Sequence, residues 1–402
     1  MTIDRRLPAL LLLIAWLGIA PRLVSQDSAA EISELRRRIA VMRTEMPSIT
    51  AAAEYAADLA TRDTAMRFFI PSDVDPALKL EFTYHAGGPP DVGDAAIAGA
   101  HALIIVPVQS WEGTGLGALM RIQRWNESGK PVIVLGSTVG KPKIQLGQAF
   151  LDNAAPDDGA RWSQLNQVAE TVLLWTWYSE FVAAATRNGW QPGIYLSVVV
   201  PGAADWNDAA RFRMPDVPRP APIAAGQLGM IYLRQIDSLL SLDETSSHRA
   251  AIAAAADTLR AVRDRGGRLF AAGCGHVAME ALPRDITDSA FHGIDWRWDV
   301  AGKVTAAGGR RGDAMLWLGY VGYDCPNIEV AGSFADLGLR VVVATNAGDH
   351  PQWLPEVAAY VPLAWRIPDA VVPVPFGPGH LGAVSSVEMM INYLWLRRLV
   401  AR

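Results

Sequence analysis

Short apolar runs and amphipathic helical stretches alternate along most of the chain. The runs are rich in β-branched and aromatic residues and have almost no polar interruption, which is typical of strands covered by helices on both faces. Alternation of such strands with helices is the pattern of parallel βαβ construction. The predicted strands span residues 67–70, 102–107, 131–136, 267–273, 314–319 and 339–345. The chain is therefore predicted to be an α/β protein.

The same order of elements occurs in both halves of the chain. Each half has a helix before its first predicted strand and ends on a long apolar helix, 168–185 in the first half and 386–400 in the second. The two closing helices also share one Glu/Trp spacing, in the pairs Glu170–Trp177 and Glu388–Trp395. Matching order and spacing favour a duplication, so we expect two successive doubly wound units.

The first residues have the order of a secretory signal. Arg5 and Arg6 precede an apolar run over 7–20, and a polar stretch begins at Gln26. The run is shorter than the roughly 20 residues that span a bilayer. We expect residues 1–25 to be removed from an exported protein, periplasmic or secreted; the alternative is a chain anchored in the membrane by this segment.

A segment rich in Pro, Arg and Asp separates the two repeats and is predicted to be a linker. The expected boundaries are 26–204 for the first unit, 205–229 for the linker and 230–402 for the second unit.

Charge limits the classes of partner. The 402 residues include 36 Lys and Arg against 41 Asp and Glu, which gives a net charge of −5. A nucleic-acid surface needs clustered Lys and Arg to neutralise phosphates, and no such cluster occurs, so nucleic acid is not an expected partner. The histidines lack the spacings of metal ligands, so no metal site is expected.

The chain has only two cysteines, Cys274 and Cys325. A chain of this size does not depend on disulfides for its core. Both residues follow predicted strands of the second unit, so they could pair in an oxidising compartment if their Cα atoms lie within about 7 Å. Two buried, unpaired thiols are the preferred expectation.

The stretch Gly267-Gly-Arg-Leu-Phe-Ala-Ala-Gly273-Cys-Gly275-His276 resembles the opening of the sugar isomerase (SIS) domain family. The resemblance continues through the strand at 338–345 and the segment 382–387; it is clear over about 230–402 and fainter over 30–205. It implies tandem SIS-like units, each a roughly five-stranded parallel sheet flanked by helices. It also implies a phosphorylated sugar or other carbohydrate ligand, since many family members are aldose–ketose isomerases or regulators. No cofactor is expected.

The chain departs from the family where phosphate is bound. His276 and Val277 stand where members usually have a Ser after the glycine turn. After the second strand, Gly319-Tyr320-Val321-Gly322-Tyr323 replaces Ser-x-Ser-Gly-x-Thr. Neither half keeps the full phosphate cradle, so both a sugar-phosphate binder and a diverged isomerase fit the resemblance.

Ligands of open parallel sheets bind beyond the carboxyl ends of the strands, where helix N-termini offer free amides. The candidate ligand contacts at such ends, or in the glycine-rich loop before the last helix, are Gly273, Gly275, Tyr320, Gly322, Thr345, His380, Ser385 and Ser386.

The candidate proton-transfer residues are His276 and Glu388. Each has a structural alternative. For His276 the alternative is a hydrogen bond to a backbone carbonyl. Ser385 with Glu388 matches a capping box that would take up the same helix amides as a phosphate.

Two other functions are also consistent with the sequence. The residues from Gly273 to Ala278 match the Gly-x-Gly-x-x-Ala dinucleotide fingerprint, with Asp295 or Asp299 about 20 positions on, which would suit an NAD(P)-binding oxidoreductase. A structural or interaction protein without a small ligand is the third class. The pairing of SIS units implied by the resemblance can be met by a homodimer or inside one chain.

Overall fold

The computed structural model describes most of the chain. The described residues are 30–83, 85–90, 101–109, 111, 114–156, 163–198, 200–214, 217–274, 290–295, 299–319, 327–346, 357–366 and 369–402. The predicted signal, 1–25, lies outside them.

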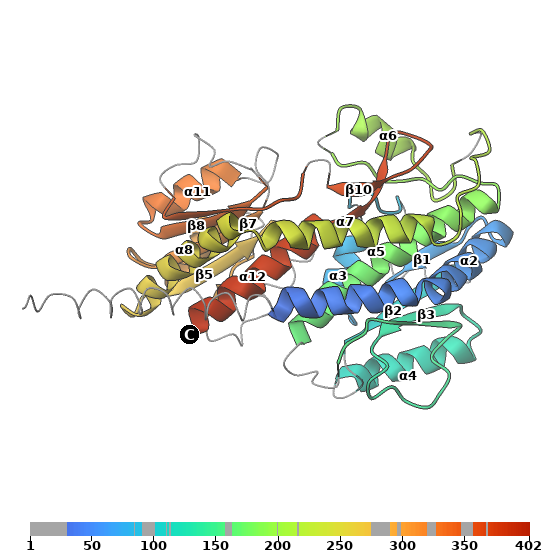
Figure 1. Ribbon diagram of the computed structural model, residues 1–402, viewed down its shortest axis with the longest axis horizontal. Coiled ribbons are helices and arrows are strands. Elements are labelled where there is room, and N and C mark those ends of the chain that lie inside the picture. The colour runs from blue at the N-terminus through green and yellow to red at the C-terminus, as the bar shows by residue number, and fades with distance from the viewer. Residues whose placement is uncertain are drawn as a thin grey trace, which may run out of the picture.

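The first half builds a sheet of four parallel strands in the order β1-β2-β3-β4. The strands are β1 (Arg67–Phe69), β2 (Ala102–Val108), β3 (Val132–Gly136) and β4 (Ala149–Asp152). The helices are one that includes residues 30–44, then α2 (Met46–Arg62), α3 (Pro76–Phe82), α4 (Thr114–Glu127) and α5 (Ser163–Arg187). Alternate residues of β2 face α4 on one side and the core beneath α2 and α5 on the other, so both faces are covered (Figure 1).

The second half builds a sheet of five parallel strands in the order β6-β5-β7-β8-β9. The strands are β5 (Leu269–Gly273), β6 (His292–Gly293), β7 (Ala314–Gly319), β8 (Arg340–Thr345) and β9 (Ala359–Pro362). Its helices are α8 (Ser246–Arg263), α10 (Val300–Ala306), α11 (Asn327–Asp336) and α12 (Ser385–Ala401). An antiparallel hairpin of β10 (Ala370–Pro373) and β11 (His380–Ala383) lies outside this sheet and leads into α12.

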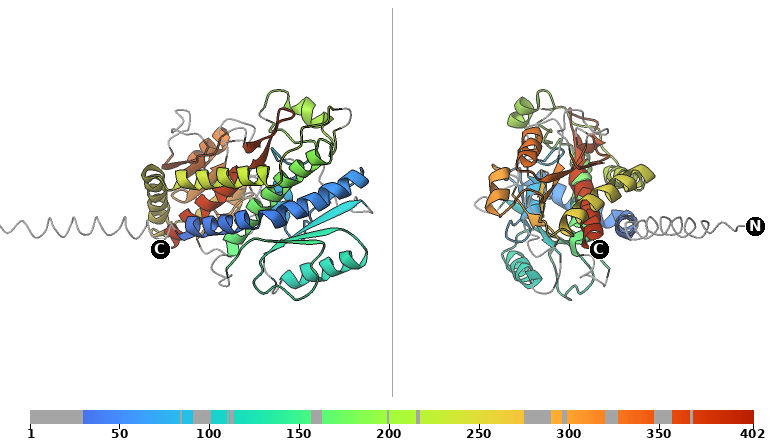
Figure 2. Two further views of the ribbon diagram at one scale, coloured as in Figure 1. Left: turned by 45° about the vertical axis from the view of Figure 1, so that its right-hand side comes forward. Right: turned by 90° about the vertical axis from the view of Figure 1, so that its left-hand side faces the viewer.

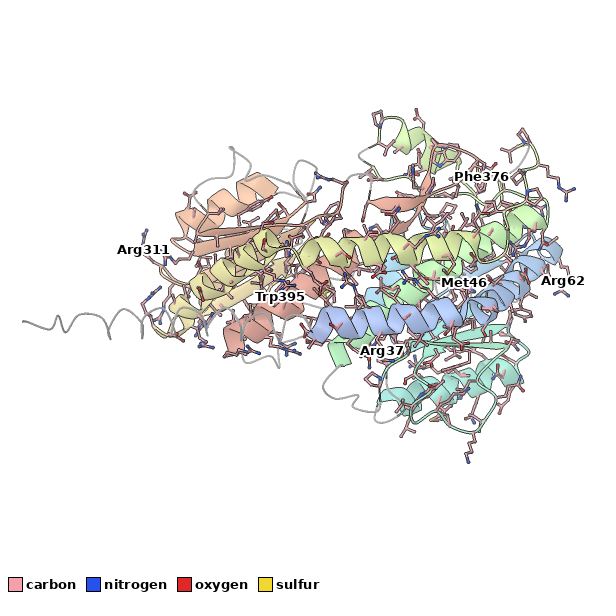
Figure 3. All side chains as sticks on the ribbon, viewed as in Figure 1. Arg37, Met46, Arg62, Arg311, Phe376 and Trp395 are labelled. Atoms are coloured by element: carbon pink, nitrogen blue, oxygen red, sulfur yellow. The ribbon has the colours of Figure 1, made fainter. Side chains whose placement is uncertain are left out.

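Two helices join the halves: α6 (Ala203–Ala209) and α7 (Gln227–Asp243). Most of α6 and the start of α7 fall inside the predicted linker 205–229. Although α7 precedes the second sheet, it packs along α5 of the first half. Gly229 allows this close approach, because a Cβ there would lie only 3.1 Å from the Cγ of Glu180 on α5. The same Cβ would lie 3.1 Å from the Sδ of Met46 on α2, which is labelled in Figure 3.

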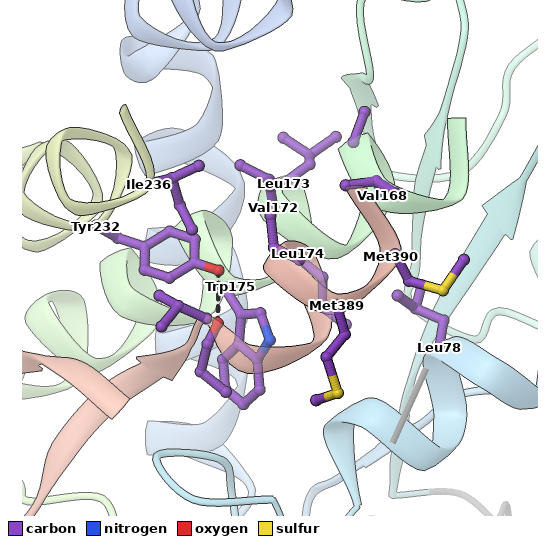
Figure 4. Close-up of a cluster of buried hydrophobic side chains, with 14 of the residues drawn as sticks. Leu78, Val168, Val172, Leu173, Leu174, Trp175, Tyr232, Ile236, Met389 and Met390 are labelled. Carbon is purple, nitrogen blue, oxygen red and sulfur yellow. Dashed lines mark hydrogen bonds between the residues drawn. The ribbon is translucent and has the colours of Figure 1, made fainter. Parts of the chain in front are cut away.

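The two sheets lie at opposite ends of the molecule, with α5, α7 and α12 between them (Figure 2). One continuous apolar cluster runs from the first half into the second. In it, Tyr232 of α7 donates a hydrogen bond to the carbonyl of Ala383 at 2.8 Å, close to Trp175 of α5 and Met389 of α12 (Figure 4).

The structure confirms the α/β class and the parallel sheets flanked by helices. All six predicted strands are present, within one or two residues of their expected limits. The short strands β4, β6, β9, β10 and β11 were not predicted. Among the described residues, no helix combines the length and apolar character needed to cross a membrane.

Candidate functional site

The strand order of the second sheet defines where a ligand crevice would lie. The chain runs from β5 to its outer neighbour β6 and then returns to β7 on the other side of β5. Such a reversal places a switch point between β5 and β7 at their carboxyl ends, the position at which open α/β sheets bind ligands. Gly273 ends β5 and Gly319 ends β7, and Cys274 N donates to Leu318 O at 2.7 Å between them.

Thr345 continues this row of strand ends. It ends β8 directly opposite Gly319, so Gly273, Gly319 and Thr345 terminate three neighbouring strands. The Thr345 hydroxyl is buried and lies 3.5 Å from the Tyr360 hydroxyl. Four other candidates for this rim lie outside the described residues: Gly275, His276, Tyr320 and Gly322. Every ligand contact expected on this rim stays a prediction.

Cys274, the first residue after β5, is buried and disulfide-bonded. No described cysteine is free. The expectation of an unpaired thiol is therefore wrong for Cys274. The sequence could not show this, because burial is expected both for an unpaired thiol and for a disulfide. Cys325 lies outside the described residues.

The two serines at the start of α12 bind carboxylates of the chain itself. Ser385 Oγ donates to Asp369 Oδ2, and Ser386 Oγ donates to Glu81 Oε2 at 2.6 Å. Both serines are fully buried. Their contact with a ligand stays a prediction that requires these bonds to break first.

His85 completes this buried cluster between the two halves. Its Nε2 lies 2.9 Å from Asp369 Oδ2 and its Nδ1 lies 3.1 Å from Glu81 Oε1. Trp175 Nε1 also donates to Glu81 Oε1, at 2.8 Å. Burial lowers the pKa of His85, but the charges and hydrogen bonds of Glu81 and Asp369 outweigh it and raise that pKa to about 10. An imidazolium therefore bridges two carboxylates at neutral pH.

None of His85, Glu81 and Asp369 was among the predicted site residues. The pair His85–Asp369 is separated by 284 positions, so no local spacing could reveal it. The only indication of this cluster in the sequence is that Glu81 and Asp369 are charged residues next to apolar segments.

Glu388 lies one turn into α12 and faces the loop after β9. Its two oxygens accept from the backbone amides of Ala364 and, at 2.8 Å, Trp365. The predicted capping box of Ser385 with Glu388 is therefore wrong: Val384 is the N-cap residue, and its own side chain makes no capping hydrogen bond. The amides of the neighbouring loop compete successfully for the carboxylate because they would otherwise be buried without a partner.

Glu388 is also paired with a second buried acid, Asp243 at the end of α7. Burial raises the pKa of Glu388 to about 7, and burial together with the Glu388 charge raises the pKa of Asp243 well above its usual range. Glu388 is completely buried. Its role in proton transfer to a ligand stays a prediction.

His380 occupies a different place from the other candidates. It begins β11, outside the five-stranded sheet, and is exposed. The preceding residue, Gly379, lies against Ile194 and Leu196 of the first half. The structure does not bring His380 to the strand ends of the second sheet.

The first sheet has its own polar strand ends. Gln109 after β2 donates to Asp75 Oδ2 at 2.9 Å, and Asn153 after β4 donates to Glu170 Oε1 at 3.0 Å. Burial and the Asp75 charge raise the pKa of Glu170 well above its usual range. Glu170 thus contacts the loop after the last strand of its sheet, as Glu388 does in the second half. Among the described side chains, no group of three or more His, Cys, Asp or Glu residues is arranged so that it could hold a metal ion.

No protein-family model matches the chain, and no curated protein matches it. Solved structures do match it over nearly its whole length. A protein from Silicibacter pomeroyi DSS-3 assigned as a phosphosugar isomerase is 13% identical, with a TM-score of 0.52, covering 93% of this chain and 97% of that one. A protein from Salmonella typhimurium LT2 assigned as a sugar-binding protein is 10% identical, with a TM-score of 0.52, covering 92% and 99%.

The C-terminal domain of glucosamine-fructose-6-phosphate aminotransferase from Francisella tularensis is 9% identical, with a TM-score of 0.50, covering 93% of this chain and 95% of that one. At these identities the likeness shows a shared fold and no more.

Proposed function

We propose that the protein binds a sugar phosphate or a related carbohydrate at the carboxyl ends of the strands in its second sheet. The observation that carries this proposal is the likeness in fold, over 93% of the chain, to a protein assigned as a phosphosugar isomerase. The SIS-like residues support the position, since that motif runs through β5 to the switch point beside Gly273. Both a non-catalytic binder and a diverged aldose–ketose isomerase fit this ligand class.

The two halves are proposed to be duplicated SIS-like units that pair inside one chain, with a homodimer as the alternative. The similar contacts of Glu170 and Glu388 with the loops after β4 and β9 support duplication. Export, with removal of residues 1–25, is proposed from the sequence of that segment alone.

A dinucleotide site is the second candidate, because of the position of Asp295. The fingerprint that begins at Gly273 requires an acidic residue at the end of the neighbouring strand. β6 is that neighbour, and Asp295 comes two positions after it ends. Asp295 is partly exposed and pairs with Lys303 at 3.4 Å. Asp299 instead caps α10 by accepting from its third amide.

Thermal-shift measurements separate these functions. Sugar phosphates should raise the Tm, and the matching free sugars and inorganic phosphate should raise it less, because binding to the folded state stabilises it. A rise with NAD or NADP alone, lost in D295N, would replace the proposal with the dinucleotide site. No rise with any of these ligands would contradict both.

A sugar phosphate that binds can then be tested for turnover. An isomerase exchanges the proton at sugar C2 with solvent, whereas a binder leaves it in place. Exchange that is unchanged in both H276A and E388Q would remove these residues as proton-transfer groups.

A further inference from the structure

The N-terminus of α12 has the features of an anion site. The helix is 17 residues long, so the free amides of its first turn carry a partial positive charge. Two backbone amides, Val384 N and Ser385 N, converge there with the Ser385 hydroxyl. The imidazole of His85 joins them from the other half of the chain.

A carboxylate of the chain itself binds all four of these groups. Asp369 Oδ1 accepts from Val384 N at 3.0 Å and from Ser385 N at 2.7 Å. Asp369 Oδ2 accepts from Ser385 Oγ and lies 2.9 Å from His85 Nε2. Asp369 is only 4% exposed, and it is fixed in this place because it immediately precedes the hairpin that returns to α12.

We propose that Asp369 is a resident anion that closes the α12 N-terminus to phosphate and thereby determines where the second half takes an anionic ligand. This inference rests on the proposed function only for the identity of that ligand. A phosphate at this helix would have to displace a buried carboxylate from four partners, each a charge-assisted hydrogen bond or ion pair.

The negative charge of the surrounding cluster also disfavours phosphate at the α12 N-terminus. One imidazolium, His85, is shared by the two carboxylates of Asp369 and Glu81, so the cluster is net negative. Glu81 also holds the second serine, Ser386, and its charge repels any further anion on that side. The remaining place for the phosphate of a sugar phosphate is at the carboxyl ends of β5 and β7. Ser385 and Ser386 donate hydrogen bonds to the buried carboxylates instead of to a ligand.

Chemical rescue tests this assignment directly. In D369A the four donors lose their acceptor, and the space left is that of a small carboxylate. Sodium acetate should raise the Tm of D369A by about 1 °C or more at concentrations several times its Kd, relative to the same concentration of sodium chloride or of acetamide. Wild type should show no acetate-specific rise.

The matched control is D313A. Asp313 is also fully buried and accepts from two backbone amides, Arg268 N and Arg310 N, each at 2.9 Å. Neither partner is a histidine, and Asp313 directly precedes strand β7 rather than a helix, so acetate should rescue D313A less than D369A. Equal effects of acetate on wild type, D369A and D313A would overturn the proposal.

D369N keeps the test decisive if D369A does not fold. Asparagine fills the same volume without the charge, so D369N should have a lower Tm than wild type and gain nothing from acetate. A Tm equal to that of wild type would show that no anion is required there, and would overturn the proposal. If wild type gives no shift with any sugar phosphate, the proposed function fails, while the acetate comparison still decides the role of Asp369.

Discussion

His85 stands between two carboxylates in the interior, so its removal leaves like charges facing each other without a cation. Loss of one partner from a buried ionic group costs about 3–5 kcal/mol. We expect the free energy of unfolding of H85A, measured by denaturant unfolding, to be lower than that of wild type by an amount in this range. His101, which pairs with Asp63 at 2.6 Å but is more than half exposed, is the matched control. H101A should change stability by less than about 1 kcal/mol.

The pH dependence of that difference follows from the pKa of His85. Glu81 and Asp369 raise it from the ordinary 6.5 to about 10, against the effect of burial. A raised histidine pKa stabilises the fold in full below pH 6.5, and this stabilisation is lost as the pH rises through about 10. The difference in stability between wild type and H85A should therefore shrink as the pH rises from 6.5 to about 10. A constant difference across this range would contradict the ionic bridge.

The acid pair Asp243–Glu388 has the opposite origin, since burial raises both pKa values. The folded state then holds protons that the unfolded state releases. For Glu388, stability therefore falls as the pH rises from 4.5 through about 7, by about 1.4 kcal/mol for each pH unit by which folding raises the pKa. D243N should reduce this fall. D237N, on the same helix but partly exposed, should keep the wild-type slope. Equal slopes for D243N and wild type would contradict a raised pKa of Asp243 in this pair.

At the scale of elements, the β10–β11 hairpin is held against α7 by a glycine. Gly382 has φ 73°, and a Cβ there would lie 2.5 Å from the Tyr232 ring. Gly129 has nearly the same φ, 72°, but a Cβ there would have nothing within 4 Å. Both alanine variants strain the backbone by about 1–2 kcal/mol, and G382A adds an overpacking cost of about 1–3 kcal/mol. Equal losses of stability in G382A and G129A would contradict this packing.

The elements that sequence predicted share one physical property. β2, β3, β7 and β8 are buried on both faces, so almost every residue in them is apolar and the run is visible without context. β4 and β9 are short, partly exposed edge strands, and β6 has only two residues, so none of them leaves a clear period.

The candidate site was predictable to the same extent. The positions of Gly273 and Thr345 at the ends of β5 and β8 followed correctly from the predicted strands, while their contact with a ligand stays a prediction. The partners of Ser385, Ser386 and Glu388 did not follow from sequence, because Glu81 is 305 positions from Ser386 and the competing amides of Ala364 and Trp365 belong to a loop. Contacts of that range depend on how the two halves pack, which periodicity does not specify.

At the scale of the whole molecule, the two sheets share one apolar core through α5, α7 and α12. Chains with two sheets often unfold in steps. The continuous cluster and the buried ionic bridge predict instead that both halves unfold together. Calorimetric and van't Hoff enthalpies should agree, and far-ultraviolet circular dichroism should follow tryptophan fluorescence. Two separated transitions in wild type would contradict a shared core.

Hydrogen exchange with and without a bound sugar phosphate tests the central claim most directly. Binding at the switch point should slow amide exchange in peptides that contain the ends of β5 and β7, around Gly273 and Gly319, while peptides from the first sheet and from the start of α12 keep their rates. Protection confined to the first sheet, or no protection anywhere at saturating ligand, would contradict a sugar-phosphate site at the second sheet.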